Sequence, residues 1–537
     1  MKMGSRHNQH DFAKVPAVHT PRSNFDRSFA AKDTMNFDRL VPFFCEEVLP
    51  GDSMNLNVDL FARLSTQIKP LMDNLYMDFH FFFVPNRLVW ENWEKFNGAQ
   101  DNPGDSTDFL VPQVESGVGT PFGVDSIADH FGINPFVNNA KVNALPFRMY
   151  NLIVNEWYRN QNLVNSLPVQ MGDGPDAVAQ YNLFIPSKRP DYFVSCLPSP
   201  QKGPASILSL GTSAPVIGTV ALNTTSTNAM LLKAASGGGV ADGGNMTNAG
   251  GGVIQQFSGG ATRPSVIDPN GRLSVTGTAD LTAATAVTIN ALRQAIMVQS
   301  LRELDNRGGT RYVEILKAHF NVVSPDFRLQ RPEFLGMGTI NINQHVIAQN
   351  SESNETPQAN LAAYSTASAS GSHIGFTKSF VEHGWVIGLC RARGEVTYQQ
   401  GLNKMWSRRT RFDYFWPKLQ ELGEQAVLTK EIYYTGVDAT DNTVFGYNER
   451  YGDYRFRPSE IRGKFRSQDP QSLDVWHVAQ EFGAAPVLNQ IFINLDTPIE
   501  RNLVVTDEPH LLVDYWFNLK HARPMVAYPV PASLGQF

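Results

Sequence analysis

Residues 75–84 read LYMDFHFFFV, a run of mostly apolar and β-prone side chains that ends at Pro85. Such a run, stopped by a proline, is typical of a strand that is covered on both faces. Upstream of it, residues 54–60 (MNLNVDL) alternate apolar and polar side chains after the turn Pro50-Gly51-Asp52. Alternation with a period of two indicates a half-buried strand. Together, these two runs predict a mainly β fold.

The rest of the chain supports the same class. Turns rich in Gly and Pro separate further β-prone runs, which predict strands at 338–348, 385–399, 430–435 and 487–495. Helices are the minority. Apolar spacing of three to four residues predicts one at 148–163 and another at 290–306, which Gly308-Gly309 should end. A third, short helix is predicted within 415–428.

The composition limits the class of protein. Of 537 residues, 42% are hydrophobic and only 18% are charged, whereas an ordinary globular protein is about 25% charged. This apolar mass excludes a disordered chain, and the net charge of −6 excludes a module that is basic throughout. Three cysteines far apart exclude a disulfide framework. A chain so poor in charge is expected either to have an unusually small exposed surface or to place much of its surface against other chains.

Catalytic and targeting signatures are absent from the sequence. No Gly-rich phosphate-binding loop, HExxH, CxxC or GxSxG motif occurs, so no enzyme active site, metal site or cofactor is expected. No stretch approaches 18 uninterrupted apolar residues, so no membrane span is expected. The N-terminus has no apolar leader segment. We therefore expect synthesis in a reducing cytoplasm.

Composition also divides the chain into parts. Residues 1–40 hold seven basic side chains against four aspartates and show no hydrophobic period, which predicts a solvated or partner-ordered basic arm. Residues 203–290 are rich in Gly, Ser, Thr and Ala and fit either a flexible linker or an ordered insertion. Apolar pairs such as Leu231-Leu232 favour the insertion. The main domain then comprises 41–202 and 291–537.

Two clusters combine cations with aromatic rings, at 404–411 (KMWSRRTR) and 451–466 (YGDYRFRPSEIRGKFR). Cations neutralise phosphates and aromatic faces stack unpaired bases, so these clusters and the arm are candidate contacts for single-stranded nucleic acid. Arginine and tyrosine are also enriched where subunits meet, and this alternative stays open. The candidate nucleic-acid-binding residues are Lys2, Arg6, Lys14, Arg22, Lys404, Arg408, Arg409, Arg411, Arg455 and Arg457.

Short motifs in a fixed order give the chain a resemblance to a known family. They cover roughly residues 25–537 without 203–290. They include LPGD (49–52), FFFVPNRLVW (81–90), CLPSPQKG (196–203), RGGTRY (307–312), RLQRPE (328–333), FGYNERY (445–451) and LDVWH (473–477). The sequence resembles the major capsid protein of gokushovirus-type Microviridae, which are small bacteriophages with single-stranded DNA.

The resemblance implies an eight-stranded jelly-roll barrel with long loops. Sixty copies would form a T=1 icosahedral shell around circular single-stranded DNA. The insertion would gather at threefold axes as a protrusion, with Gly238, Asn245, Gly251 and Phe257 as candidate host-facing residues. The expected partners are further copies of the chain, the DNA genome and a host-cell surface receptor. Assembly is expected in the cytoplasm of the bacterial host.

The net charge raises a question for the packaging of DNA. A chain with a net charge of −6 has the same sign as the phosphates, so the bulk charge of a shell opposes packaging. Neutralisation must come from a locally basic inner surface, from counterions or from a small basic DNA-binding virion protein. The arm at 1–40 and the cluster at 408–411 are therefore expected to lie inside.

Two other classes of protein also fit the composition. A soluble β-rich carbohydrate-active enzyme would need a pair of carboxylates about 5–10 Å apart in an aromatic cleft. A minor spike or pilot protein would occur in few copies per virion. The size of the purified assembly and the copy number distinguish these classes from a capsid protein.

Overall fold

A computed structural model describes residues 21–204, 289–348 and 361–528, except 118 and 329, and short strands at 216–218, 246–247, 253–255 and 277–279. The chain divides into two compact units. The first comprises Met1–Gly203 with Arg302–Phe537, and the second comprises Pro204–Leu301. In the second unit, β9 (Val216–Gly218) pairs with β12 (Gly277–Ala279), and β10 (Met246–Thr247) pairs with β11 (Val253–Gln255).

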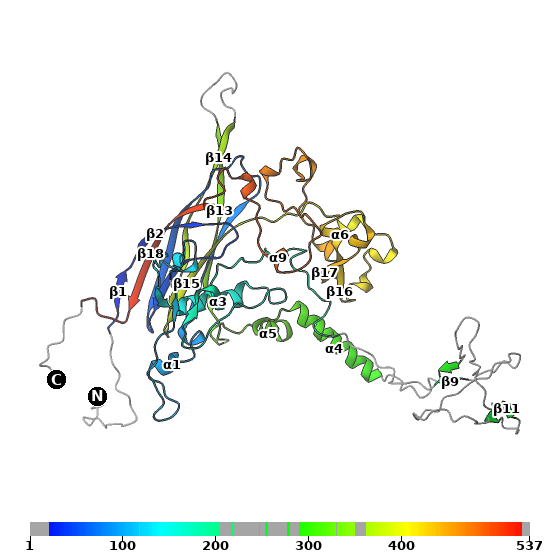
Figure 1. Ribbon diagram of the computed structural model, residues 1–537, viewed down its shortest axis with the longest axis horizontal. Coiled ribbons are helices and arrows are strands. Elements are labelled where there is room, and N and C mark those ends of the chain that lie inside the picture. The colour runs from blue at the N-terminus through cyan, green and yellow to red at the C-terminus, as the bar shows by residue number, and fades with distance from the viewer. Residues whose placement is uncertain are drawn as a thin grey trace, which may run out of the picture. The chain divides into compact units, whose positions relative to one another are not determined.

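The first unit is built on one large antiparallel sheet (Figure 1). Eight strands follow a path of hydrogen-bonded neighbours, β1-β18-β4-β14-β13-β5-β15-β3, and β2 pairs with β18 as a ninth strand. The predicted mainly β class is confirmed. The strands are β1 (Ser23–Asp26), β2 (Phe29–Met35), β3 (Val41–Val48), β4 (Ser53–Leu64), β5 (Leu75–Pro85), β13 (Glu333–Ala348), β14 (Leu361–Ser379), β15 (Gly384–Gly394) and β18 (Leu511–Arg523).

Strand β5 carries the sequence LYMDFHFFFV through the middle of the sheet, with β13 on one side and β15 on the other. Phe79 and Phe81 belong to the core inside the curled sheet, whereas Phe82 and Val84 belong to a second core on the opposite face. Side chains alternate across a strand, so a strand buried on both faces needs an unbroken apolar run. The prediction that this strand is covered on both faces is confirmed.

The sheet curls until its two ends meet through aromatic rings. The ring of Phe43 on β3 lies 5.2 Å from that of Tyr515 and 6.0 Å from that of Phe517, both on β18. Phe29 of β2 stacks on Phe517 at 4.7 Å. Because β3 and β18 lie near opposite ends of the strand order, these contacts close the core as expected for a jelly-roll barrel.

Helices and short sheets make up the other regular elements, and α3 (Leu145–Ile153) packs against β15 of the large sheet. This helix, which lies beside β15 in Figure 1, continues directly into a π-helix, η2 (Val154–Tyr158). The other helices are α1 (Trp93–Phe96), α2 (Ile127–His130), α4 (Ile289–Arg307), α5 (Tyr312–Phe320), α6 (Thr429–Ile432), α7 (Asp438–Asp441), α8 (Gly452–Arg455) and α9 (Gln490–Ile493). The short sheets join β6 (Gln113–Glu115), β7 (Lys141–Asn143) and β8 (Asp176–Ala177), and β16 (Glu424–Leu428) with β17 (Val444–Glu449).

The structure agrees with two of the predicted helices and corrects the third. The helix predicted at 290–306 is α4, and it ends before Gly309, whose φ of 92° suits a glycine. The helix predicted at 148–163 is α3 with η2. The helix predicted within 415–428 is wrong. A 3₁₀ turn at Pro417–Leu419 is followed by Gly423, with a φ of 87°, and then by strand β16.

Two of the predicted strands are also wrong. Residues 430–435 and 487–495 contain the short helices α6 and α9 instead. A polar side chain caps each of these turns. Glu431 accepts the Leu428 N–H at 3.0 Å, and Asn489 accepts the Phe492 N–H at 3.0 Å. Such local side-chain bonds compete with strand pairing, which the apolar pattern alone does not show.

The predicted arm needs a correction at its C-terminal end. Within residues 1–40, β1 and β2 are part of the large sheet, because their backbones pair with β18 from Leu511 to Phe517 and again from Lys520 to Arg523. Backbone pairing at a sheet edge needs no hydrophobic period, so the composition of the segment concealed it. Residues 1–20 lie outside the described part of the chain.

We expect acid to destabilise the fold through His80 of β5. Burial, and then the charge of Arg391, lower the pKa of His80 from 6.5 to about 4. Between these values the unfolded chain binds the proton more readily, so stability is lost as the pH falls through this window. Urea unfolding measures the free energy of unfolding at pH 7 and at pH 4.5. Between these two pH values, the parent chain should lose about 1–3 kcal/mol more of this free energy than the variant His80→Gln. Equal losses of stability in the parent chain and in His80→Gln would contradict the role given to His80.

Candidate nucleic-acid interface

The structure describes seven of the ten predicted nucleic-acid contacts. Lys2, Arg6 and Lys14 lie outside the described residues, and so do the candidate host-facing residues Gly238, Asn245, Gly251 and Phe257. Arg22 is exposed at the start of the large sheet, where its Nη2 donates to Ser53 Oγ at 2.8 Å. The other six predicted contacts lie on two segments that meet, near 404–411 and 449–457.

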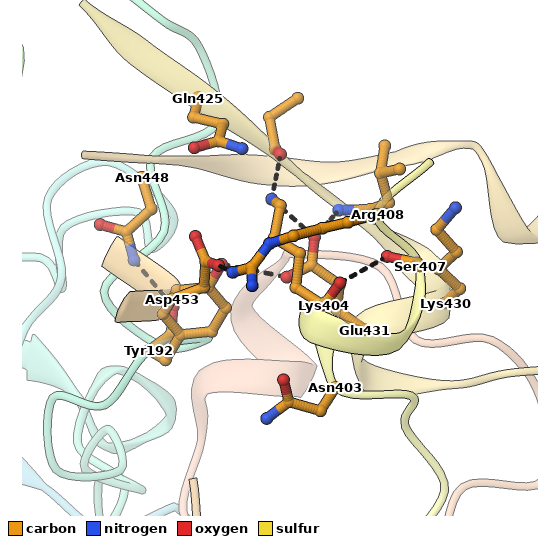
Figure 2. A network of polar contacts seen from close by, with 12 residues as sticks. Tyr192, Asn403, Lys404, Ser407, Arg408, Gln425, Lys430, Glu431, Asn448 and Asp453 are labelled. Atoms are coloured by element: carbon orange, nitrogen blue, oxygen red, sulfur yellow. Dashed lines mark hydrogen bonds and ion pairs between the residues drawn. The ribbon is translucent and has the colours of Figure 1, made fainter. Parts of the chain in front are cut away.

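Lys404 is held in a polar network rather than directed into solvent (Figure 2). It opens a 3₁₀ turn, and Asn403 caps this turn by accepting the Met405 N–H at 3.1 Å. Lys404 Nζ lies 3.1 Å from Glu431 Oε1 and donates to the Ala426 carbonyl at 3.3 Å. Tyr192 Oη also donates to Glu431, at 3.0 Å. The positive charge of Lys404 is therefore neutralised inside the protein.

Arg408 is paired in the same way. Its guanidinium forms an ion pair with Asp453 and lies 4.0 Å from the ring centroid of Tyr454, and both charged side chains are largely buried. Two amides tie the network to the neighbouring strands. Asn448 donates to the Tyr192 carbonyl at 3.0 Å (Figure 2). Gln425 accepts the Tyr451 N–H at 3.0 Å. Contacts of this kind join the two clusters that the sequence placed some 45 residues apart.

The remaining candidate cations are more exposed. Arg455 pairs with Glu449 at 2.7 Å, and Arg457 pairs with Glu460 at 3.2 Å. Arg411 lies over the ring of Trp416 at 4.4 Å. Arg409 is exposed, and its side chain makes no ion pair with any residue that the structure describes. Arg409 is therefore the member of this cluster whose charge is most available to a phosphate.

Large apolar side chains surround this cluster on the surface. Trp406 is 72% exposed and Phe412 is 64% exposed, and Tyr414 and Phe415 are exposed beside them. Exposed apolar rings of this kind suit contact with another molecule.

The structure also bears on metals and membranes. Within the described ranges, no group of three or more His, Cys, Asp or Glu side chains is placed to hold a metal ion. No helix among these residues has the length and apolar character needed to cross a membrane.

Comparison with known proteins identifies the family. The family model described as capsid protein (F protein) matches residues 13–533. The chain belongs to this family of phage capsid proteins. Capsid protein VP1 of Bdellovibrio phage phiMH2K is 57% identical over 551 residues, which cover the whole of both chains. Capsid protein VP1 of Chlamydia phage 1 is 40% identical and that of Spiroplasma virus 4 is 35% identical, each over 97% of both chains.

Membership of the F-protein family confirms the resemblance to the capsid proteins of gokushovirus-type Microviridae. A capsid protein is a structural component of the virion, so the chain is not an enzyme, and the carbohydrate-active alternative is excluded. The spike or pilot alternative is set aside because the full-length relatives are capsid proteins. Family membership also implies a homo-oligomeric shell.

The two neighbouring arginines of this capsid protein should behave differently when they are removed. Arg408→Ala leaves the buried carboxylate of Asp453 unpaired and should lower the free energy of unfolding by about 2–4 kcal/mol. Arg409→Ala removes an exposed cation and should change the free energy of unfolding by less than about 0.5 kcal/mol. Urea unfolding of both variants measures the difference. A similar small loss in both would show that the Arg408 pair contributes little to stability.

Proposed function

We propose that sixty copies of this chain assemble into a closed T=1 icosahedral shell around circular single-stranded DNA. The main support is the full-length similarity to phage capsid proteins. The exposed apolar side chains of the first unit give the proposal a physical basis, because symmetric copies would remove them from water. Assembly would take place in the cytoplasm of the bacterial host.

DNA packaging needs positive charge on the inner surface of the shell. Sixty copies with a net charge of −6 carry about −360 in total, which repels phosphates. We propose that the basic arm and the cluster around Arg409 and Arg411 face the interior, and that a small basic virion protein supplies further positive charge. Arg22, Arg455 and Arg457 are also exposed enough to take part, whereas Lys404 and Arg408 serve chiefly to hold the cluster together.

The insertion at 203–290 is proposed to face the host receptor. Its low charge and its content of Gly, Ser and Thr suit a surface loop that packs against its own copies. Gly238, Asn245, Gly251 and Phe257 are its proposed host-facing residues.

Assembly is tested by the size of the purified protein. The chain produced in bacteria should sediment as a closed particle or as a defined assembly precursor, and electron microscopy should then show icosahedral symmetry. A protein that stays monomeric at every concentration and salt condition would contradict the proposed shell. A side-chain-resolution structure of the filled particle tests the interior: the DNA proposal fails if Arg409 and Arg411 point outward or contact only protein.

The role of the insertion is tested by deletion. Removing residues 230–260 should leave particles that assemble but do not infect. Loss of assembly would instead make the segment structural. The control is a replacement of equal length by Gly and Ser, which keeps the chain length and removes the specific side chains.

A further inference from the structure

A cavity of about 530 Å³ lies where the π-helix η2 ends above strands β5 and β13. Its apolar wall carries the half-buried rings of His80, Tyr158 and Phe334 and the exposed side chain of Met337. Tyr158 Oη and His80 Nδ1 are 2.9 Å apart, which holds both rings in place. Its size and its aromatic wall suit a planar ring of the kind found in a nucleobase.

All the charged side chains that line this cavity are cationic, beside the neutral polar residues Asn160, Ser187 and Ser195. The cations are Arg159, Lys188, Arg189 and Arg391, and no carboxylate lines the cavity although the chain as a whole has a net charge of −6. Two of these cations already donate hydrogen bonds to residues outside the cavity lining. Lys188 Nζ donates to Gln480 Oε1 at 2.7 Å, and Arg391 Nε donates to Asp78 Oδ2 at 3.1 Å.

The other two cations have spare hydrogen-bonding capacity. Arg189 is exposed and forms no ion pair with any of the described residues. Arg159 donates from Nη1 to the Val164 carbonyl at 3.1 Å, but its buried Nε has no partner. Burial, and then the nearby Arg311, lower the pKa of Arg159. An unpartnered guanidinium donor on Arg159 and the exposed guanidinium of Arg189, in the lining of one cavity, favour an anionic ligand.

Two further cavities adjoin this one, and we call the three together the groove. A second cavity of about 290 Å³ shares Arg189 and Pro190 with the first and is also lined by the rings of Tyr398 and Phe456. A third shares Arg457 and Pro458 with the second. Carboxylates enter only in these later parts, as Asp191, Glu395 and Glu460. Each of the three cavities is thus lined by both cations and aromatic rings, which is typical of a site for single-stranded nucleic acid.

We propose that this groove binds single-stranded DNA, with a base stacked in the cavity of His80, Tyr158 and Phe334 and its phosphates on Arg159 and Arg189. The inference rests on the proposed packaging function and names a contact surface for it that lies apart from the arm and from Arg409. The surplus of cations in the first cavity favours an anionic polymer over an apolar segment of a neighbouring copy as the occupant.

The test uses the unassembled full-length chain and a fluorescent oligonucleotide of twenty thymidines, with binding followed by anisotropy at several salt concentrations. Arg189→Ala should weaken binding about fivefold or more, and it should reduce the slope of log affinity against log salt by about 0.7. Arg159→Ala should have a similar effect. The matched control is Arg63→Ala on β4, which removes an exposed arginine outside the groove and should leave affinity unchanged.

Stacking is tested with an abasic oligonucleotide of the same length. It should bind the parent chain about tenfold more weakly than the thymidine oligomer. Equal affinities of the two oligonucleotides would mean that no base stacks in the cavity, and would overturn the stacking part of the proposal.

Particle formation separates this inference from the proposed function. If the parent chain forms shells but Arg189→Ala binds DNA as well as Arg63→Ala does, the groove proposal fails and the shell proposal stands. If Arg189→Ala blocks the formation of empty shells without changing affinity for DNA, the groove receives a neighbouring copy, and the DNA proposal is overturned. If the parent chain forms no particle, the proposed function fails whatever the groove binds.

Discussion

Asp176→Asn should lower the free energy of unfolding by about 3–5 kcal/mol, because it breaks a fully buried ion pair. The side chains of Arg148 and Asp176 are 0% and 2% exposed. Arg148 Nε and Nη2 each donate to one Asp176 oxygen at 2.7 Å, in a bidentate pair that joins α3 to β8. Tyr181 Oη also donates to Asp176, at 2.6 Å. Asparagine keeps the shape of the side chain but leaves the guanidinium, which cannot lose its proton, without a counter-charge.

Urea unfolding of the unassembled chain, followed by tryptophan fluorescence, measures this loss. The matched control is Asp514→Asn, which breaks the exposed pair with Lys32 and should cost no more than about 1 kcal/mol. Equal losses in the two variants would mean that burial of the Arg148 pair does not set its contribution to stability.

Strand prediction worked where burial imposes a pattern on the sequence. β4 alternates between buried and more exposed residues, and β5 is buried on both faces. The sequence therefore shows an alternating apolar pattern in β4 and a nearly continuous apolar run in β5. β1 and β2 show no such apolar pattern, because they join the sheet through backbone pairing with β18. The strands predicted at 430–435 and 487–495 failed because Glu431 and Asn489 cap helical turns there. Apolar content alone does not distinguish a short buried helix from a strand.

The candidate site was predictable only as far as residue type allows. The sequence located the cations of the 404–411 cluster but not their partners. Lys404 and Arg408 pair with Glu431 and Asp453, which lie 27 and 45 positions away along the chain. The first cavity of the groove was not predicted, because Arg159 and Arg189 come from separate segments and line one cavity only in the fold. Arg457, in the later part of the groove, was among the predicted contacts. The signal that the sequence did contain was the adjacency of Trp157, Tyr158 and Arg159.

Removing two exposed phenylalanines should abolish assembly while leaving the chain folded. α5 buries none of its residues, and Phe320 at its end is 70% exposed. Val323 and Phe327 continue this apolar strip, at 76% and 59% exposed. Buried apolar anchors at an interface contribute about 2 kcal/mol or more each. Because every copy in a closed shell repeats the same contacts, Phe320→Ser with Phe327→Ser should shift the protein from particles to free chains.

Sedimentation measures the shift from particles to free chains. Urea unfolding of the free chains should show a change in the free energy of unfolding below about 1 kcal/mol, since neither ring is buried within the chain.

The matched control is Val381→Ser in the turn between β14 and β15. Val381 is 87% exposed but stands alone beside the ion pair of Glu382 with Arg87. Full particle yield from the double variant would mean that the strip from Phe320 to Phe327 faces solvent in the shell. Equal loss of particles with Val381→Ser would mean that exposed apolar area matters wherever it lies. Loss confined to the double variant would place a contact between copies on α5 and the turn that follows it.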